Sequence, residues 1–286
     1  MGLLASVLSA VLSATKDLVS KKLAFRLDGT ASTYASFAYA LPFYLLVLVV
    51  LGVSGHETIS ISLTFLLLVF LRGVTDTLAE GMKMHAFSHG DISLVASFFS
   101  LSPLFLLITS PLITGDRLTL PAVIAMFLVV GGSLLLVYRP STQGWREQKK
   151  SILLASGAAL FFSLNSCFDR LAVQEGTPVF AGFAMTLLSA VFLFPLVVRR
   201  RDRLQALRVE RKALLVRGVL EVAFMVSKLT ALQYLQAPYV VGIHRLSLLL
   251  SIIGGRVFFH EQDFGRRLAA GVLILGGVFW IAWLQW

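Results

Sequence analysis

Charged residues recur at helical spacing inside a long apolar stretch of the chain. Arg72, Asp76, Glu80 and Lys83 are separated by four, four and three residues, so in a helix they share one face. A charged group at the centre of a membrane helix costs roughly 2.5–3.5 kcal/mol, so such a face must meet other polar groups or a wet cavity. These side chains can therefore bind a polar ligand, carry a proton or hold helices together.

The same charges return in the second half of the sequence. The pentapeptide RGVTD, which begins at Arg72, is matched by RGVLE from Arg217 to Glu221, and Lys83 is matched by Lys228. Charged residues at matching depths in two halves of an apolar chain are typical of transporters built from repeats. In the alternative, structural interpretation, the Arg and the acid of each pentapeptide pair with each other and hold the repeat interface together.

Two features break this symmetry. Glu80 is matched by Met225, and the adjacent His244 and Arg245 are matched by an uncharged Phe-Ser pair. Because a substrate is not two-fold symmetric, we expect specificity to come from such positions. Arg245, with His244 beside it, suits the anionic group of a substrate through bidentate contacts, and Glu80 suits a coupling proton. The polar residues near the ends of the first helix of each half are gate candidates: Lys16, Asp17, Asn165 and Asp169.

The composition indicates a membrane environment. Of the 286 residues, 57% are hydrophobic and 14% are charged, and the mean hydropathy is +0.84. Apolar runs of about 20 residues recur, which predicts helices rather than the short alternating segments of a barrel. We therefore predict an all-α integral membrane protein with ten transmembrane helices arranged as two inverted five-helix repeats. The predicted spans are 2–20, 30–52, 61–82, 92–113, 119–138, 151–170, 177–198, 212–232, 238–258 and 266–285.

Two polar segments interrupt the apolar pattern. Residues 141–150 are the predicted linker between a first repeat at 1–140 and a second repeat at 151–286. The basic segment at 199–212 has two interpretations. It can form a short amphipathic helix whose apolar residues face lipid headgroups, or a basic cytoplasmic loop without regular structure, which we favour.

Basic residues are unevenly distributed among the predicted loops. Loops after the odd-numbered spans hold most of the 25 Lys and Arg residues, whereas those after the fourth and sixth spans hold only Arg117 and Arg170. Under the positive-inside rule, the odd-numbered loops face the cytoplasm and both termini face outward. The net charge of +10 belongs largely to these loops, so it does not require a nucleic-acid partner.

Two acids and two glycine pairs have simpler structural interpretations. Asp116 and Glu261 each precede a predicted helix, where a carboxylate caps free N–H groups and meets the positive end of the helix dipole. The glycine pairs at 131–132 and 276–277 are expected to let helices pack closely.

Two segments carry a resemblance to a known family. SLSPLFLLITSPLITGDRLT at 100–119 and RLSLLLSIIGGRVFFHEQDF at 245–264 each precede a helix with a glycine pair. In this pattern the chain resembles the drug/metabolite transporter superfamily, specifically its ten-helix members with two EamA repeats. Leu248 stands where the first half has Pro103, so the two halves are expected to bend differently. Members are usually drawn with both termini cytoplasmic, the reverse of the orientation that the charges predict here.

The resemblance implies a carrier of small organic metabolites, driven by an ion gradient or by exchange. We predict a secondary active transporter of a small polar metabolite (an amino acid, another zwitterion or an organic anion), working by alternating access with its site at the repeat interface. A flippase for a phosphate-linked lipid or sugar carrier would use the same arginines and is an alternative. An integral membrane enzyme is an alternative of another class, but the sequence contains no Ser/His/Asp grouping or metal motif to support it.

The expected partners follow from this prediction. The chain has one cysteine, Cys167, and no phosphate-binding loop, so no cofactor, metal ion or catalytic residue is expected. A proton or a counter-substrate would provide the coupling. The expected partners are the metabolite and membrane lipid, without nucleic acid and without a required oligomer. The expected location is the cell membrane, which the chain would cross several times.

Overall fold

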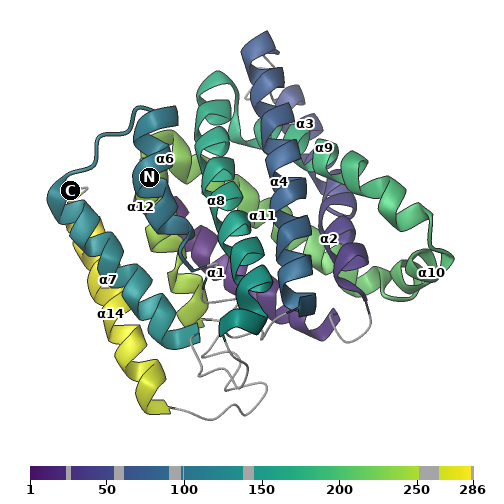
Figure 1. Ribbon diagram of the computed structural model, residues 1–286. Helices are drawn as coiled ribbons and strands as arrows, with labels where there is room; N and C mark the ends of the chain where they lie inside the picture. Colours follow the sequence, from purple (N-terminus) through teal and green to yellow (C-terminus); the bar gives the residue numbers. More distant parts are fainter. Residues whose placement is uncertain are drawn as a thin grey trace. The chain divides into compact units, whose positions relative to one another are not determined.

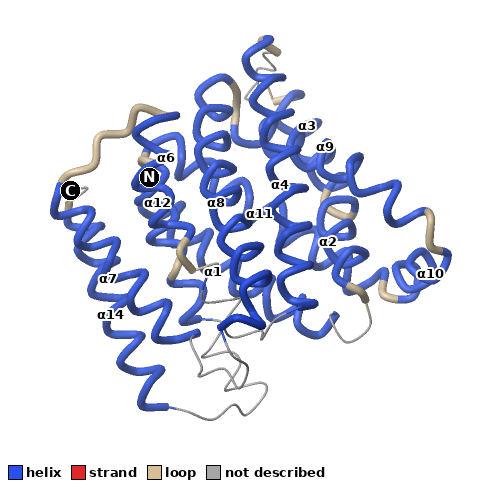
Figure 2. The backbone as a smooth tube through the Cα atoms, in the orientation of Figure 1, coloured by secondary structure: helices blue, strands red, loops and turns tan. Residues whose placement is uncertain are grey.

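The computed structural model is helical throughout the part of the chain that it describes, with no strand there (Figure 2). The described residues are 1–23, 27–54, 61–89, 98, 100–137, 145–250 and 264–284. Because each helix satisfies its own backbone hydrogen bonds, this architecture suits a chain that lies in hydrocarbon.

The chain forms two compact units. The first consists of Met1–Thr77 and Phe168–Tyr234, and the second of Leu78–Cys167 and Leu235–Trp286. Each unit therefore combines segments from both predicted repeats, and the repeat boundaries themselves remain a prediction.

In the first unit, α1 packs along α11, and α2 and α3 pack on α9 (Figure 1). Its helices are α1 (Gly2–Leu23), α2 (Gly29–Ala38), α3 (Leu41–Val53), the first part of α4 (Leu63–His89), the end of α8 (Trp145–Glu175), α9 (Pro178–Val198), α10 (Arg201–Val209) and α11 (Arg211–Tyr234).

The two faces of α1 show how this unit suits lipid. Ser6, Ser9 and Ala10 are fully buried, so the inner face carries small residues that let another helix approach. Leu4 and Leu8 on the other face are 75% and 51% exposed. Large apolar side chains on the outside and small ones inside are the arrangement expected where the solvent is lipid.

The second predicted span is divided into two helices. Asp28 caps α2 by accepting from the Ala31 N–H at 2.7 Å, and α2 ends where Tyr39 and Ala40 form a turn before α3. Gly218 of α11 lies directly against this turn, because a Cβ there would collide with the Tyr39 carbonyl oxygen. The glycine of the second pentapeptide therefore makes room for the turn.

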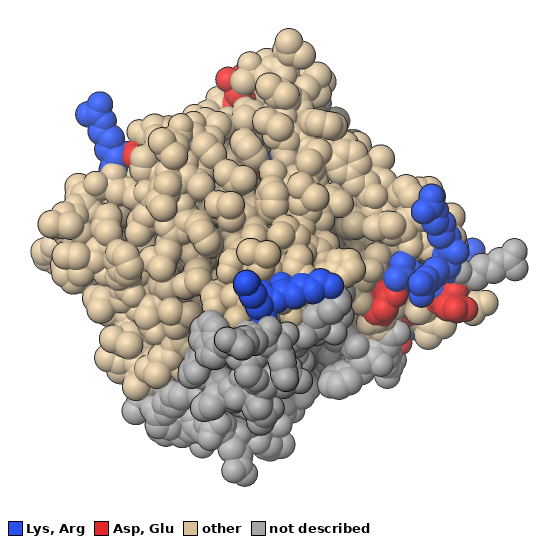
Figure 3. All heavy atoms as spheres, in the orientation of Figure 1, with Lys and Arg blue, Asp and Glu red and all other residues tan. Residues whose placement is uncertain are grey.

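The basic segment after α9 is a helix, so the favoured prediction of an irregular loop is wrong. Helix α10 packs its apolar face inward, since Leu207 is 5% exposed in a cluster with Leu27 and Val197. Arg203 fixes it to the cap of α2 through an ion pair of 2.6 Å with Asp28. Only Val209, which is 79% exposed, keeps the outward orientation of the amphipathic interpretation. Charged atoms gather over α10 in Figure 3.

In the second unit, α7 packs against α14, and α12 packs against α6, α7 and α14. These helices are α6 (Ser102–Ile113), α7 (Leu120–Val137), α12 (Ala237–His244) and α14 (Phe264–Trp283), alongside the remaining parts of α4 and α8.

One glycine of each predicted pair lies at the α7–α14 crossing. A Cβ on Gly132 would lie 2.8 Å from the Ala270 carbonyl oxygen, and a Cβ on Gly277 would lie 2.8 Å from the Ala125 carbonyl oxygen. The close packing expected of the pairs is therefore confirmed for these two glycines. The preceding glycine of each pair has open space at the Cβ position.

Asp116 caps a helix, but one from the other half of the sequence. Gly115 has φ of 69°, a left-handed conformation that favours glycine, and it turns the chain after α6. Asp116 then accepts hydrogen bonds from Ser110 Oγ and, at 3.3 Å, from the N–H of Ala237 at the start of α12. Glu261, its repeat equivalent, lies outside the described residues.

Three of the described helical segments are long and apolar enough to cross a membrane: Lys149–Glu175, Pro178–Val198, and Gly29–Val53, which combines α2 and α3. Shorter apolar helices lie in several other predicted spans, including Gly2–Lys16 and Leu120–Leu135. These helices support the prediction of a helical membrane protein, and the number of ten membrane spans stays a prediction.

Candidate functional site

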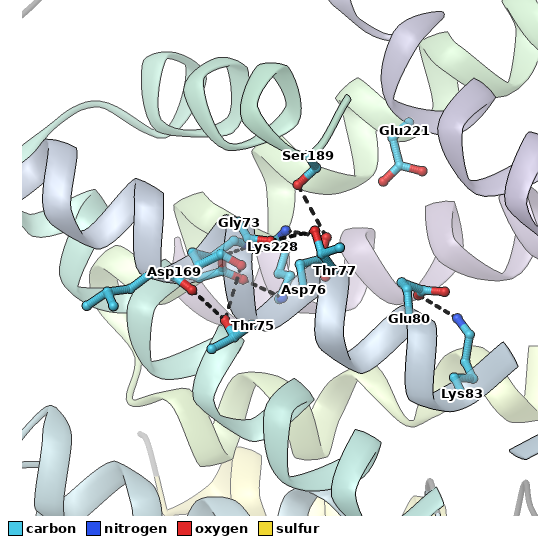
Figure 4. A network of polar contacts seen from close by, with 12 residues as sticks. Gly73, Thr75, Asp76, Thr77, Glu80, Lys83, Asp169, Ser189, Glu221 and Lys228 are labelled. Atoms are coloured by element: carbon cyan, nitrogen blue, oxygen red, sulfur yellow. Dashed lines mark hydrogen bonds and ion pairs between the residues drawn. The ribbon is translucent and has the colours of Figure 1, made fainter. Parts of the chain in front are cut away.

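A buried chain of ion pairs lies within the first unit. On α4, Arg72 Nη1 is 2.6 Å from Asp76 Oδ2, one helical turn away. On α8, Asp169 Oδ1 accepts a hydrogen bond of 3.1 Å from Arg72 Nε. On α11, Lys228 Nζ lies 2.8 Å from Asp169 Oδ2. We call these four residues the charge network; Figure 4 shows its neighbourhood.

The charge network is neutral as a whole and almost dry. Asp169 is 0% exposed, Asp76 is 6% exposed and Arg72 is 7% exposed, whereas the Lys228 side chain retains 16%. Ser189 of α9 also donates to Asp76 Oδ2, at 3.4 Å. Burying an unpaired ion costs several kcal/mol, so two cations and two anions can stay buried here only because each has an opposite partner.

The charge network is not symmetric between the two halves of the chain. Arg72 is matched in the sequence by Arg217, and Lys228 by Lys83, but the position that matches Asp169 is Ala24. The central acid therefore has no counterpart in the first half. The sequence prediction listed Asp169 only as a gate candidate.

Glu221 and Arg217 have other partners than each other. Lys16 of α1 forms an ion pair of 3.1 Å with Glu221 of α11, and its ammonium lies 4.0 Å from the centre of the Phe224 ring. Arg217 donates to the Ser32 carbonyl oxygen at 2.8 Å. Of the two intrahelical pairs predicted from the pentapeptides, the structure forms the one in α4 and replaces the one in α11.

Glu80 and Lys83 pair with each other in the second unit. Their ion pair spans 2.5 Å and three residues of α4, and Lys83 also lies 5.4 Å from the centre of the Phe162 ring (Figure 4). Glu80 Oε2 is buried and has no hydrogen-bond partner among the residues that the structure describes. Its predicted role in proton coupling remains a prediction.

Arg245 stands at a break in a helix. Helix α12 ends at His244, Arg245 forms the turn, and residues 246–250 are helical again. The Arg245 Nε is buried without a hydrogen-bond partner in the described part of the chain. Interrupted helices are where secondary transporters commonly bind substrate, so this geometry fits the predicted role of Arg245.

The first half breaks at the matching place. Ser100 and Leu101 form a turn before α6, and Ser100 is the sequence equivalent of Arg245. Pro103 lies in the first turn of α6 and Leu248 in the helical residues 246–250, and the expectation that the two halves bend differently stays a prediction. The Leu101 N–H bonds to the Phe98 carbonyl, so backbone geometry makes the turn in the first half as well.

The predicted gate residues lie in different surroundings. Lys16 and Asp169 take part in buried ion pairs, and Asn165 is 3% exposed on α8. The side chain of Asp17 is outside the described part of the structure.

The hydroxyl-bearing residues near the charged groups of the first unit were not predicted from the sequence. Ser189 and Thr186 are both buried on α9, an apolar helix without charged residues, at a spacing of three. That spacing of small polar residues on one face was the available signal, since such groups commonly bond across membrane helices. Ser32, which accepts from Arg217, had no comparable signal.

The geometry of the charge network permits exchange of ionic partners. Asp169 bridges two cations from different helices, so movement of either helix or protonation of this acid would change the pairing.

Among the described residues, no group of three or more His, Cys, Asp or Glu side chains could hold a metal ion.

The EamA-like transporter family matches the chain twice, at residues 1–138 and 149–283. The chain belongs to the EamA-like transporter family. The resemblance inferred from the sequence is thus confirmed, and this EamA-like protein is a helical membrane protein of the drug/metabolite transporter type.

Other comparisons of the EamA-like protein concern its fold. A solved structure described as "Crystal structure of protein" superposes with a TM-score of 0.76 at 16% identity, covering 99% of this chain and 98% of that chain. At this identity the likeness shows the fold alone. No curated protein matches the sequence.

Proposed function

We propose that this EamA-like protein is a secondary active transporter, and not an enzyme, for a small polar metabolite: an amino acid, another zwitterion or an organic anion. The charge network carries the proposal. It places four ionised groups in the interior of a membrane protein, where charges are costly and usually belong to a transport pathway or binding site.

Alternating access is supported by the origin of these groups. Arg72 and Asp76 come from the first matched repeat, while Asp169 and Lys228 come from the second. Lys16 and Glu221 form another ion pair between the repeats. Movement of one repeat against the other would break these pairs in one state and keep them in the other. The free energy of the pairs would therefore influence whether the inward-open or the outward-open state is populated.

Two cations are candidates for the anionic group of the substrate. Arg245 has a buried Nε without a hydrogen-bond partner in the described part of the chain, and Lys228 keeps part of its side chain exposed. Arg245→Ala and Lys228→Gln, compared in one binding assay, separate these positions. The variant that loses binding while it remains folded identifies the contact.

The transport proposal is tested by reconstituting the purified protein into liposomes. Liposomes are loaded with unlabelled amino acids or organic anions, and exchange with the labelled compound is measured with and without a proton gradient. We expect exchange of at least one compound above the level of protein-free liposomes, and the exposed-residue variant Lys212→Gln should match the wild type. Compounds that raise the melting temperature but never cross the membrane would make this protein a receptor instead.

A further inference from the structure

We propose that the space between Arg72 and Lys228 is a carboxylate-binding site, which the Asp169 side chain occupies in this structure. A carboxylate of the transported metabolite would occupy it after Asp169 has taken up a proton from a hydronium ion of the aqueous phase and its side chain has turned aside. This inference rests on the proposed transport function, and it assigns the substrate to carboxylates, whether simple anions or zwitterions.

The way in which Asp169 is held supports the proposal. Its two carboxylate oxygens bind two cations from two helices, Oδ1 to Arg72 at 3.1 Å and Oδ2 to Lys228 at 2.8 Å. A carboxylate from a ligand could bind both cations in the same manner. With 0% exposure, Asp169 is the inner group, whereas Lys228 keeps 16% of its side chain exposed and marks the side from which a ligand would arrive.

The charges around Asp169 limit the ligand to one negative charge. Arg72 keeps Asp76 as a partner at 2.6 Å when Asp169 becomes neutral. Lys228 has no other ion-pair partner among the described residues, so one positive charge is left uncompensated. One carboxylate can then bind for each proton that Asp169 takes up.

Other ionisable groups near Asp169 already have partners. Glu221 on α11 is paired with Lys16 on α1, and Arg170 on α8 donates to the Leu232 carbonyl oxygen. Tyr44 on α3 is fully buried as well. The groups that act on Asp169 are Arg72 on α4 and Lys228 on α11, with Asp76 behind Arg72 and Tyr44 of α3 close enough to interact electrostatically.

The repeats supply an independent observation. The two cations have matching residues in the other half, Arg217 and Lys83, but the acid between them does not, because Ala24 matches Asp169. A purely structural pairing would be expected to recur with the cations. An acid that takes up a proton or yields its place to a substrate would be needed at only one of the two equivalent positions.

Chemical rescue with acetate tests the site directly, because acetate has the shape of the aspartate side chain beyond its Cα. In Asp169→Ala, sodium acetate should raise the melting temperature, whereas acetamide, its neutral counterpart, should not. The double variant Asp169→Ala/Lys228→Gln should need at least ten times more acetate for the same rise in melting temperature. Adding Lys83→Gln instead, at the repeat equivalent of Lys228, should leave the response intact.

Asp169→Asn provides a second measurement, since asparagine imitates the protonated acid, which the two cations no longer hold and which can turn away from the space between them. Acetate should bind this variant about ten- to a hundredfold more tightly than the wild type at neutral pH. If acetate and acetamide act alike on both Asp169 variants, no carboxylate site exists here.

The liposome assay separates failure of this inference from failure of the proposed function. If acetate rescues the variant but the protein transports nothing, the carboxylate site is supported and the proposed transport function is wrong. If the wild type and Asp169→Asn both transport with the same pH dependence, the transport function is supported and the proton-linked site at Asp169 is wrong.

Discussion

The environment of an arginine, rather than its charge alone, determines what its removal does to this protein. Arg72 lies between two carboxylates, whereas the Nε of Arg245 is buried without a hydrogen-bond partner in the described part of the chain. The charge of Arg72 is compensated by these acids, whereas the Arg245 Nε has no such compensation among the described residues.

Leucine at these two positions should therefore have opposite effects. Arg72→Leu leaves Asp76 and Asp169 short of a cation and should lower the free energy of unfolding by about 3–5 kcal/mol. Arg245→Leu removes a charge that has no ion-pair partner among the described residues and should keep or raise the melting temperature of the substrate-free protein. Thermal unfolding in detergent measures both; equal losses would show that Arg245 is a structural residue.

Asp116 should affect stability rather than transport. Asp116→Asn removes a charged acceptor that binds Ser110 and the first N–H of α12, which should cost about 0.5–2 kcal/mol. The melting temperature should fall while transport per folded molecule stays unchanged. Ser110→Ala is the matched control, since it removes one of these hydrogen bonds and keeps the charge. A folded Asp116→Asn protein without transport would contradict the capping role.

The residues of the charge network differ in how far the sequence could place them. The Arg72–Asp76 pair was predictable, because residues four apart in a helix are neighbours. Lys228 and Asp169 are 59 residues apart on different helices, and no spacing rule joins them. Nor does spacing show that Glu221 takes its partner from α1 instead of its own helix.

At the scale of helices, the sequence identified the apolar runs but not their interruptions. The turn at Tyr39 and Ala40 is followed by Pro42 at the start of α3, which lacks an N–H donor, and Gly218 of the neighbouring helix leaves space for the turn. The basic segment that forms helix α10 was expected to be only a loop. The helix forms because Leu207 and the ion pair of Arg203 hold it against other helices.

The glycine pair of α7 provides a matched test of helix packing. Gly132→Ala should lower stability, because its Cβ would lie 2.8 Å from a backbone oxygen of α14, where little can move. Gly131→Ala has open space and should stabilise the helix by about 0.5–1 kcal/mol. Melting temperatures of the two variants check this, and a lower value for Gly131→Ala would contradict the assigned crossing.

At the scale of the whole molecule, orientation in the membrane follows from the distribution of basic loops. A reporter active only in the cytoplasm should give signal when fused after Gln205, in the basic segment, and none when fused after the C-terminal Trp286. The reverse result would restore the orientation usually drawn for this family, with both termini in the cytoplasm.

The composition of the first unit also bears on how such a chain could arise. Because the unit takes Met1–Thr77 from one half and Phe168–Tyr234 from the other, an ancestor of half the length could have built it only by bringing two copies together. In that assembly every residue would have been present twice, so an acid at one position would have appeared at both. Duplication and fusion of the gene would have released this constraint. After it, one copy could carry Asp169 while the other carried Ala24.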